Sequence, residues 1–302
     1  MTSFVHRGFF YRDEPEWLDE VVPFLRHAVV AGEPALAAIS SRRHEALRDA
    51  LGTDADGVEL VPIEVTGKNP GRLLSVWHDF AERHPRHRRL RGVAETVWPG
   101  RRPDEIVECQ HHEQLVNVAF DDRDLELICP YDVASLDPGV IEAAHRSHPV
   151  TGTVGRHEPN PAFALDVSLS APLSPPPADA PAFELGIHSL RDLRRRVDAH
   201  ASSIGLAPAR AYDLVLAVSE AMTNSVLHAQ GGVLTWWDEP GRVVCEIRDA
   251  GHLTDPLVGR LRPPPDAPGG RGVWMLHQMC DLVQIRSTPA GTTVRLAMDL
   301  DD

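Results

Sequence analysis

Lysine is almost missing from this sequence of 302 residues, in which Lys68 is the only one. Acidic side chains outnumber basic ones by 44 to 30, so the formal net charge is −14. A chain this acidic is a poor partner for nucleic acid or for an anionic membrane surface, and we expect neither as its main partner. A local basic site for a nucleotide stays compatible with this balance.

Cysteines and long apolar runs are also scarce. The four cysteines, Cys109, Cys129, Cys245 and Cys280, show no C-x2-C spacing, which favours reduced thiols in the cytoplasm. The first residues, MTSFVHRGFFYRDEPEW, carry charges too early for a signal peptide. No apolar run reaches the roughly 18 residues of a membrane span. We therefore expect a soluble cytoplasmic protein.

The length allows two domains with separate cores. A segment rich in Pro, Ala and Ser, PNPAFALDVSLSAPLSPPPADAP, has no amphipathic period and is typical of an exposed linker. We therefore predict a first domain at 1–157, a linker at 158–181 and a second domain at 182–302.

Short apolar runs alternate with helical patterns in the first domain. The runs are ALAAIS, VELVPIE, RGVAETVW and LELICPY, and the expected helices lie near 14–31, 71–83 and 103–120. This alternation predicts an α/β sandwich with a parallel sheet covered on both faces. No G-x4-G-K-[ST] motif is present, since Lys68 is followed by Asn-Pro. We therefore expect no ATP hydrolysis by this domain.

Two polar clusters in this domain are candidates for a ligand site. CQHHE at 109–113 begins an H-E-x-x-H pattern but ends it with Val116, which excludes a zinc protease. CPYD at 129–132 ends a strand, where α/β sheets often bind ligands. With the histidine near the N-terminus, the candidate sensory pocket comprises His6, His112, Glu113, Cys129, Tyr131 and Asp132. It either binds a metal or small molecule or is a hydrogen-bonded part of the core.

The opening FVHRGFFYRDEPEWLDEVVPFLRHAVVAGEPALAAIS, the helix HHEQLVNVAF and the strand ending CPYD resemble the MEDS sensory domains over residues 4–155. The resemblance implies a fold related to the RecA-like ATPases. It also implies that the domain senses a small organic molecule, without assigning roles to residues.

The stretch LVLAVSEAMTNSVLH at 214–228 is the most informative part of the second domain. Glu220, Asn224 and His228 recur every four residues and form one row on a helix. The opposite stripe faces the core and comprises Leu214, Val218, Met222 and Ser225. Leu216 and Leu227 flank the polar row, which predicts a helix buried on two sides. A buried polar row needs partners, which are either each other or a ligand.

Three further segments follow in order: VVCEIRDAG ending at Gly251, GGRGVWML from Gly269, and GTTVRL from Gly291. A helix with carboxylate-x3-amide, a strand ending in Asp-x-Gly, a glycine-rich turn into a helix and a Gly-Thr-Thr strand resemble the boxes of the Bergerat-fold ATPases. That group includes gyrase, the histidine kinases and the anti-sigma-factor serine kinases. The resemblance implies a second α/β sandwich that binds ATP with Mg²⁺.

The resemblance also implies a role for each residue. Asn224 would hold Mg²⁺, Glu220 would act as general base toward a serine hydroxyl, and Asp249 would accept a hydrogen bond from adenine. The remaining nucleotide contacts would come from His228, Gly251, Arg260, Gly270, Arg271, Gly272, Thr292 and Thr293. The Pro-rich stretch at 252–268 would form a lid. The family pattern Asp-x-Gly-x-Gly has Leu253 here in place of its second glycine.

A strand at 182–187 and one helix at 189–203, with Ser189 as its N-cap, precede the boxed helix. This order favours the anti-sigma-factor kinases over histidine kinases, whose phospho-accepting histidine lies on a two-helix hairpin. We therefore expect a serine/threonine kinase that phosphorylates an anti-anti-sigma (STAS-type) partner and sequesters a sigma factor. The alternative is a non-catalytic switch that sequesters its partner with an occupied or empty nucleotide site. Both hypotheses are compatible with a homodimer.

Overall fold

The computed structural model describes residues 4–153, 155–264 and 270–300. The chain forms two compact α/β units, Met1–Val167 and Ser168–Asp302. The first contains a mainly parallel sheet and the second a separate antiparallel sheet, as the predicted fold class requires.

The first unit is built on a seven-stranded sheet with the strand order β3-β2-β4-β5-β1-β6-β7. Neighbours from β3 to β6 run parallel, and β7 pairs with β6 in the antiparallel sense. The strands are β1 (Val5–Tyr11), β2 (Ala35–Ile39), β3 (Val58–Pro62), β4 (Leu90–Ala94), β5 (Leu125–Asp132), β6 (Val150–Thr153) and β7 (Arg156–Pro159). The four apolar runs of the sequence form β2 to β5.

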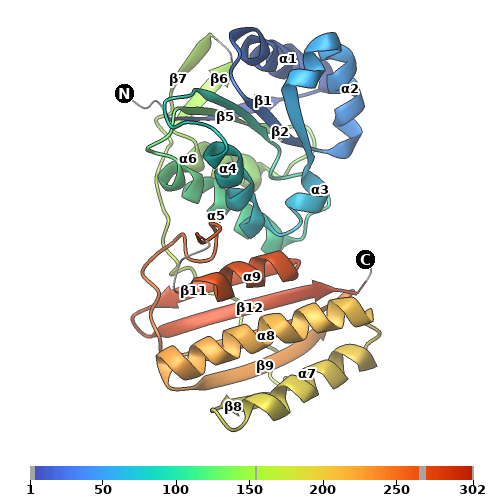
Figure 1. The fold of residues 1–302 in the computed structure, drawn as a ribbon, viewed down its shortest axis with the longest axis vertical. Coiled ribbons are helices and arrows are strands. Elements are labelled where there is room, and N and C mark those ends of the chain that lie inside the picture. Colours follow the sequence, from blue (N-terminus) through green and yellow to red (C-terminus); the bar gives the residue numbers. More distant parts are fainter. Residues whose placement is uncertain (1–3, 154, 265–269, 301–302) are drawn as a thin grey trace. The chain divides into compact units, whose positions relative to one another are not determined.

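Helices cover both faces of this sheet, with α1 and α2 on one face and α4, α5 and α6 on the other (Figure 1). Their bounds are α1 (Glu14–Ala31), α2 (Ser41–Leu51), α3 (Ile63–Thr66), α4 (Leu73–Glu82), α5 (Pro103–Ala119) and α6 (Pro138–Ser147), with short 3-10 turns at Gly52–Gly57 and Pro70–Arg72. α1 begins where Asp13 accepts a hydrogen bond from the Glu16 amide, and it ends at Gly32 with φ of 65°. Its fully buried Trp17 and Leu25 pack in the core beside the strands.

The second unit has a five-stranded sheet with the order β11-β12-β10-β9-β8, in which all neighbours are antiparallel. The strands are β8 (Ala182–Leu185), β9 (Gly232–Glu239), β10 (Arg242–Asp249), β11 (Leu282–Thr288) and β12 (Gly291–Asp299). One face carries the helices α7 (Leu190–Ser203), α8 (Pro208–Ala229) and α9 (Arg271–Met279) (Figure 1). Leu214, Val218 and Met222 of α8 are fully buried in the core of this unit, as the predicted stripe requires.

The segment predicted as a linker spans the division between the units, and the part after Ser168 packs on the second one. Leu169 is buried, and its carbonyl accepts a hydrogen bond from the Ser287 amide of β11 at 2.8 Å. Arg295 of β12 donates to the carbonyl of Ser174. This stretch therefore lies along the sheet of the second unit.

Two local predictions for the second unit need correction. Ser189 lies at the N-cap position of α7 as predicted, but its side chain does not cap the helix; its hydroxyl accepts from the Gly186 amide and shares its one proton between the Glu184 and Gly186 carbonyls. Leu227 is 65% exposed, so α8 is not buried on two sides at its C-terminal end. An apolar residue near a helix end is often left in water, because apolar atoms also make up much of a protein surface.

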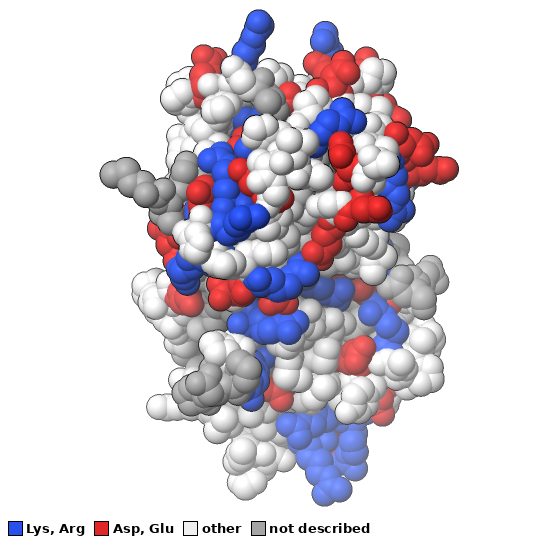
Figure 2. Space-filling model, turned by 45° about the horizontal axis from the view of Figure 1, so that its top comes forward, with Lys and Arg blue, Asp and Glu red and all other residues white. Residues whose placement is uncertain are grey.

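Acidic and basic side chains are interspersed over the face shown in Figure 2. A group of basic side chains also gathers at the lower end of this view. Among the residues that are described, no helix combines the length and the apolar character needed to cross a bilayer.

Candidate nucleotide site and a buried polar cluster

The polar row of α8 faces the first turn of α9. A Cβ atom at position 272 would lie 3.1 Å from Glu220 Oε2 and 3.4 Å from Asn224 Nδ2, so a side chain there would crowd both polar groups. α9 begins after Gly270, which has a left-handed φ of 86° and no side chain to cap the first amides. The amides of a helix N-terminus attract anions, and the first turn of α9 lies beside Glu220 and Asn224.

Asp249 at the end of β10 is held from two sides. The Ser225 hydroxyl of α8 donates to Asp249 Oδ2, and the Gly251 amide donates to Asp249 Oδ1 at 2.8 Å. A carboxylate has about four lone-pair sites, so two remain for a ligand. Asp249 is therefore oriented by its neighbours and still able to accept a hydrogen bond from an amino group.

A chain of hydroxyl groups fixes the loop after β10. The Leu253 amide donates to Ser287 Oγ of β11, Ser287 Oγ lies 2.8 Å from Thr292 Oγ1 of β12, and Thr292 Oγ1 donates to the Gly251 carbonyl. Since Thr292 gives its proton to Gly251, the Ser287 hydroxyl donates to Thr292. All members of the chain therefore have a donor or acceptor, and the loop is tied to two strands.

These segments surround a cavity of about 290 Å³. The predicted residues that line it are Asn224, His228, Asp249, Gly251, Gly270, Gly272 and Thr292. Apolar walls come from Ala221, Leu253, Val273, Leu276 and Val294. Apolar walls with a few oriented polar groups are typical of a site for a small molecule.

Not every predicted residue reaches this cavity. Glu220 abuts it through Gly272 without lining it. Arg260 is 1% exposed and does not line the cavity, and Arg271 is exposed at the start of α9. Thr293 belongs to a different surface hollow, beside Arg248 and Arg295, because neighbouring residues of a strand point to opposite faces. Gly269 and the predicted lid residues 265–268 lie outside the described residues.

The sequence interpretation missed two residues of the site, Ser225 and Ser287. Ser225 was assigned to the stripe that faces the core, where it is indeed 2% exposed. A serine among Leu214, Val218 and Met222 was the signal, since a buried hydroxyl needs a partner. Ser287 carried no such signal, because its role depends on β11 lying beside β12.

The first unit contains a second group of functional side chains. His6, Glu113 and Cys129 of the predicted sensory pocket meet His148, and we call these four the buried polar cluster. Tyr131 lies next to it, with its ring centroid 5.5 Å from that of His148. His112 is buried on α5 but is not among the four.

Burial and the neighbouring His148 lower the pKa of His6, which favours a neutral imidazole. Burial and the Glu113 carboxylate raise the pKa of the Cys129 thiol and of the Tyr131 hydroxyl well above their usual values. The buried polar cluster is therefore shielded from water, and the Glu113 carboxylate is the main charged group acting on its neighbours.

Asp132 lies elsewhere, at a hollow of about 250 Å³ on the carboxyl edge of the parallel sheet. Arg43 pairs there with Glu95 at 3.2 Å, and burial raises the pKa of the Glu95 carboxyl. The predicted sensory pocket is thus split between a closed cluster and an edge hollow.

Comparisons with known proteins agree with both resemblances. Residues 5–149 match the family described as "MEDS: MEthanogen/methylotroph, DcmR Sensory domain", and residues 183–298 match "Histidine kinase-like ATPase domain". The chain therefore carries a MEDS domain followed by a histidine kinase-like ATPase domain.

Among solved structures, the chain is similar to the RsbU and RsbW domains of Rv1364c from Mycobacterium tuberculosis. The TM-score is 0.31 and the identity 22%, over 41% of this chain and 32% of that chain. The chain thus spans about a third of the solved relative. Curated proteins gave no match.

Proposed function

We propose that this chain is a signalling regulator whose second domain is an ATP-dependent serine/threonine kinase of the anti-sigma-factor type. One observation carries the proposal: Asn224 of α8, the first turn of α9 and the oriented Asp249 of β10 line one cavity, and Glu220 abuts that cavity through Gly272. A histidine kinase-like ATPase domain spans all of them.

The residues suit the chemistry of phosphoryl transfer, which depends on positioning and charge neutralisation. The Asn224 amide supplies a hard oxygen for Mg²⁺, which when bound to ATP would neutralise phosphate charge. The amides after Gly270 face the same place and would hold phosphate oxygens. Glu220, one turn before Asn224, would accept the proton of an attacking serine or threonine hydroxyl.

Asp249 would select adenine by accepting a hydrogen bond from its amino group. The apolar walls at Leu253, Val273 and Leu276 would pack on the ring. Leu253 replaces the second glycine of the family pattern, but its amide is used by Ser287 and its side chain packs against the core. The substitution therefore builds one wall of the cavity.

The proposed substrate is a STAS-type anti-anti-sigma protein, and the proposed sequestered partner is a sigma factor. The MEDS domain would report a small molecule or partner to the kinase domain. All four cysteines are free and buried, which suits the reducing cytoplasm where we place this signalling.

A second candidate is a non-catalytic switch that binds its partner without phosphorylating it. It is favoured by Arg260, which is buried away from the cavity, so this arginine does not neutralise phosphate there. Such a switch would use the same nucleotide cavity, empty or occupied, to set its affinity for the partner.

The first experiment measures transfer of labelled phosphate from Mg-ATP to a panel of STAS-type proteins. It compares the native chain, Glu220→Gln and the matched control Glu184→Gln, whose exposed carboxylate lies on β8. We expect transfer by the native chain and the control. Glu220→Gln should lose at least about 100-fold of the rate, as for removal of a general base, while calorimetry shows retained Mg-ATP binding.

Equal transfer by Glu220→Gln and the native chain would contradict the role of Glu220. Nucleotide-dependent binding of a panel member without any transfer would establish the non-catalytic switch. A native chain that does not bind Mg-ATP at all would overturn both nucleotide-dependent forms of the proposal.

A further inference from the structure

We propose that the first unit binds one divalent transition-metal ion of the zinc class through the buried polar cluster His6, Glu113, Cys129 and His148. The proposal is independent of the kinase assignment, because every residue that carries it lies in the other unit. All four side chains are at most 2% exposed, and one ligand atom of each lies within 4.8 Å of all the others.

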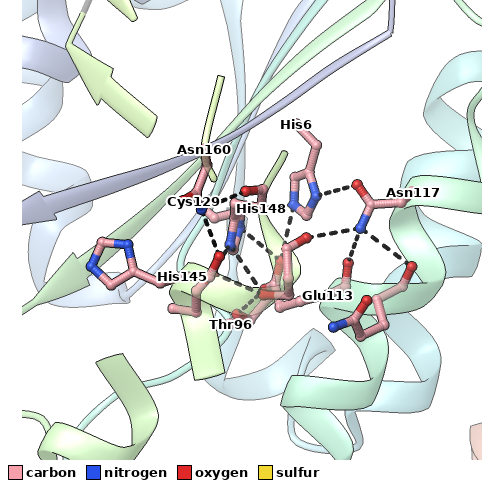
Figure 3. Close-up of polar contacts among 11 residues, drawn as sticks. His6, Thr96, Glu113, Asn117, Cys129, His145, His148 and Asn160 are labelled. Atoms are coloured by element: carbon pink, nitrogen blue, oxygen red, sulfur yellow. Dashed lines mark hydrogen bonds and ion pairs between the residues drawn. The ribbon is translucent and has the colours of Figure 1, made fainter. Parts of the chain in front are cut away.

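The distances between the ligand atoms fit a tetrahedral site. His6 Nε2 lies 3.1 Å from Glu113 Oε2 and 3.4 Å from Cys129 Sγ, and His148 Nε2 lies 3.3 Å from Glu113 Oε2. Bonds of about 2.0–2.3 Å to a tetrahedral zinc ion place neighbouring ligand atoms about 3.3–3.7 Å apart. These three of the six pairs are therefore close to the spacing that such an ion requires, and the other three pairs lie within 4.8 Å (Figure 3).

Asn117 fixes the tautomer of His6. The Asn117 amide group donates to the Glu113 and Ser147 carbonyls at 2.9 Å, so its Oδ1 is the acceptor that faces His6 Nδ1 at 3.1 Å. His6 Nδ1 therefore carries the proton, and a neutral His6 turns the lone pair of Nε2 toward the cluster. This arrangement, with the outer ring nitrogen bonded to an acceptor, is the usual support of a metal-bound histidine.

His148 repeats the arrangement from the end of α6. Its Nδ1 lies 2.7 Å from the Ala144 carbonyl, which can only accept, so Nδ1 is the donor. Its Nε2 is buried and faces Glu113 Oε2 at 3.3 Å. Two imidazole nitrogens, a thiol and a carboxylate oxygen thus converge in a dry place, where one cation would meet four ligand atoms.

The fold also orients Glu113 and leaves space for the His148 ring. The Thr96 hydroxyl donates to Glu113 Oε1, which leaves Oε2 for the ion. A Cβ at position 8 would lie 3.2 Å from the His148 ring, so Gly8, which pairs with Cys129 across β1 and β5, makes room for that imidazole. Positions 6, 113, 129 and 148 are brought together from β1, α5, β5 and the end of α6.

Charge and ligand type favour the zinc class of ion. Binding would release the thiol proton of Cys129, so two anionic ligands and two neutral imidazoles would hold a dication at zero net charge. A charge-neutral site is the form in which a buried dication costs least desolvation. Sulfur and imidazole ligands select zinc-like ions over Mg²⁺ or Ca²⁺, which prefer oxygen. Four protein ligands close the site, as in structural and metal-sensing centres.

The test uses the full chain, treated with a chelator and titrated with Co²⁺ and then Zn²⁺ without nucleotide. We expect one Co²⁺ per chain, intense visible bands of four-coordinate cobalt and a near-ultraviolet charge-transfer band from a thiolate, all abolished by one equivalent of Zn²⁺. Cys129→Ser should lose the thiolate band. The matched control Cys109→Ser, also a buried cysteine of this unit, should keep it.

His148→Gln should weaken Co²⁺ binding at least about tenfold. Circular dichroism and the thermal unfolding transition report whether each variant is folded. A native chain that takes up no Co²⁺, or that binds it without a thiolate band, would overturn the proposal even if the variants misfold. A thiolate band that survives in folded Cys129→Ser would overturn it as well.

Discussion

At the scale of single residues, Asp249 shows how the second unit prepares a ligand contact before any ligand arrives. Ser225 and Gly251 each occupy one of its carboxylate oxygens. A side chain held in this way loses little rotamer freedom on binding, so more of the hydrogen-bond energy contributes to affinity.

Asp249→Asn tests this contact. The amide would still accept from Gly251, and the Ser225 hydroxyl can turn to accept from it, so the fold should persist. A hydrogen bond to a charged group contributes about 1.5–3 kcal/mol, which corresponds to a loss of ATP affinity of roughly 10-fold or more. Calorimetric titration with Mg-ATP measures the loss.

The control for this change is Asp238→Asn, which alters an aspartate of β9 that pairs with His200 and does not line the cavity. It should leave ATP affinity unchanged. If both variants bind ATP like the native chain, Asp249 does not contact the base.

At the scale of elements, much was predictable. The period of four in Glu220, Asn224 and His228 predicted the polar row of α8, and the apolar runs predicted strands β2 to β5. These features depend on short-range patterns, which sequence carries directly. By contrast, His148 was missed because it joins His6 and Cys129 only through the pairing of distant elements.

The roles of Thr292 and Thr293 could not be predicted from short-range patterns either. Thr292 and Thr293 look equivalent in sequence, and only the register of β12 decides between them. Thr292 pairs with Asp249 across the sheet and faces the cavity, whereas Thr293 faces the opposite surface. A shift of one residue in register would exchange their roles.

Thr292→Val should therefore break the hydroxyl chain between β11, β12 and the loop. The substitution removes the Thr292 hydroxyl, which is the hydrogen-bond partner of the Gly251 carbonyl and of the Ser287 hydroxyl. Thr292 is only 6% exposed, so water does not readily replace it. Such a loss costs about 1–3 kcal/mol of unfolding free energy, which urea denaturation can measure. ATP affinity should fall too, because Gly251 and Leu253 line the cavity.

Thr293→Val is the matched control for this pair. It should change the unfolding free energy by less than about 0.5 kcal/mol, since the residue lies on the other face and valine suits a strand. Equal effects of the two substitutions would show that the hydroxyl chain does not hold the loop.

At the scale of the whole molecule, the two α/β units are similar in size but differ in which groups lie at the N-terminus of a helix. In the second unit, α9 begins after Gly270, which provides no side-chain cap. In the first, internal carboxylates occupy the start of α2: the Ser40 amide donates to Glu95 at 3.0 Å and the Ser41 amide to Glu64 at 2.8 Å. A phosphate there would meet two carboxyl groups that already occupy these amides.

We therefore expect one Mg-ATP per full-length chain, bound by the second unit alone. Asn224→Ala should reduce binding from one equivalent to none at nucleotide concentrations that saturate the native chain, because it removes the oxygen proposed to hold Mg²⁺. Thr223→Ala, the neighbouring residue on α8, bonds the Ser219 carbonyl of its own helix and should keep full stoichiometry. Calorimetry of both variants with Mg-ATP measures the stoichiometry.

One equivalent remaining in Asn224→Ala would mean either that Asn224 is dispensable or that the first unit binds nucleotide. Adding Glu95→Gln would separate these cases. Loss of the carboxylate charge beside Ser40 should strengthen a phosphate site in the first unit and leave one in the second unchanged.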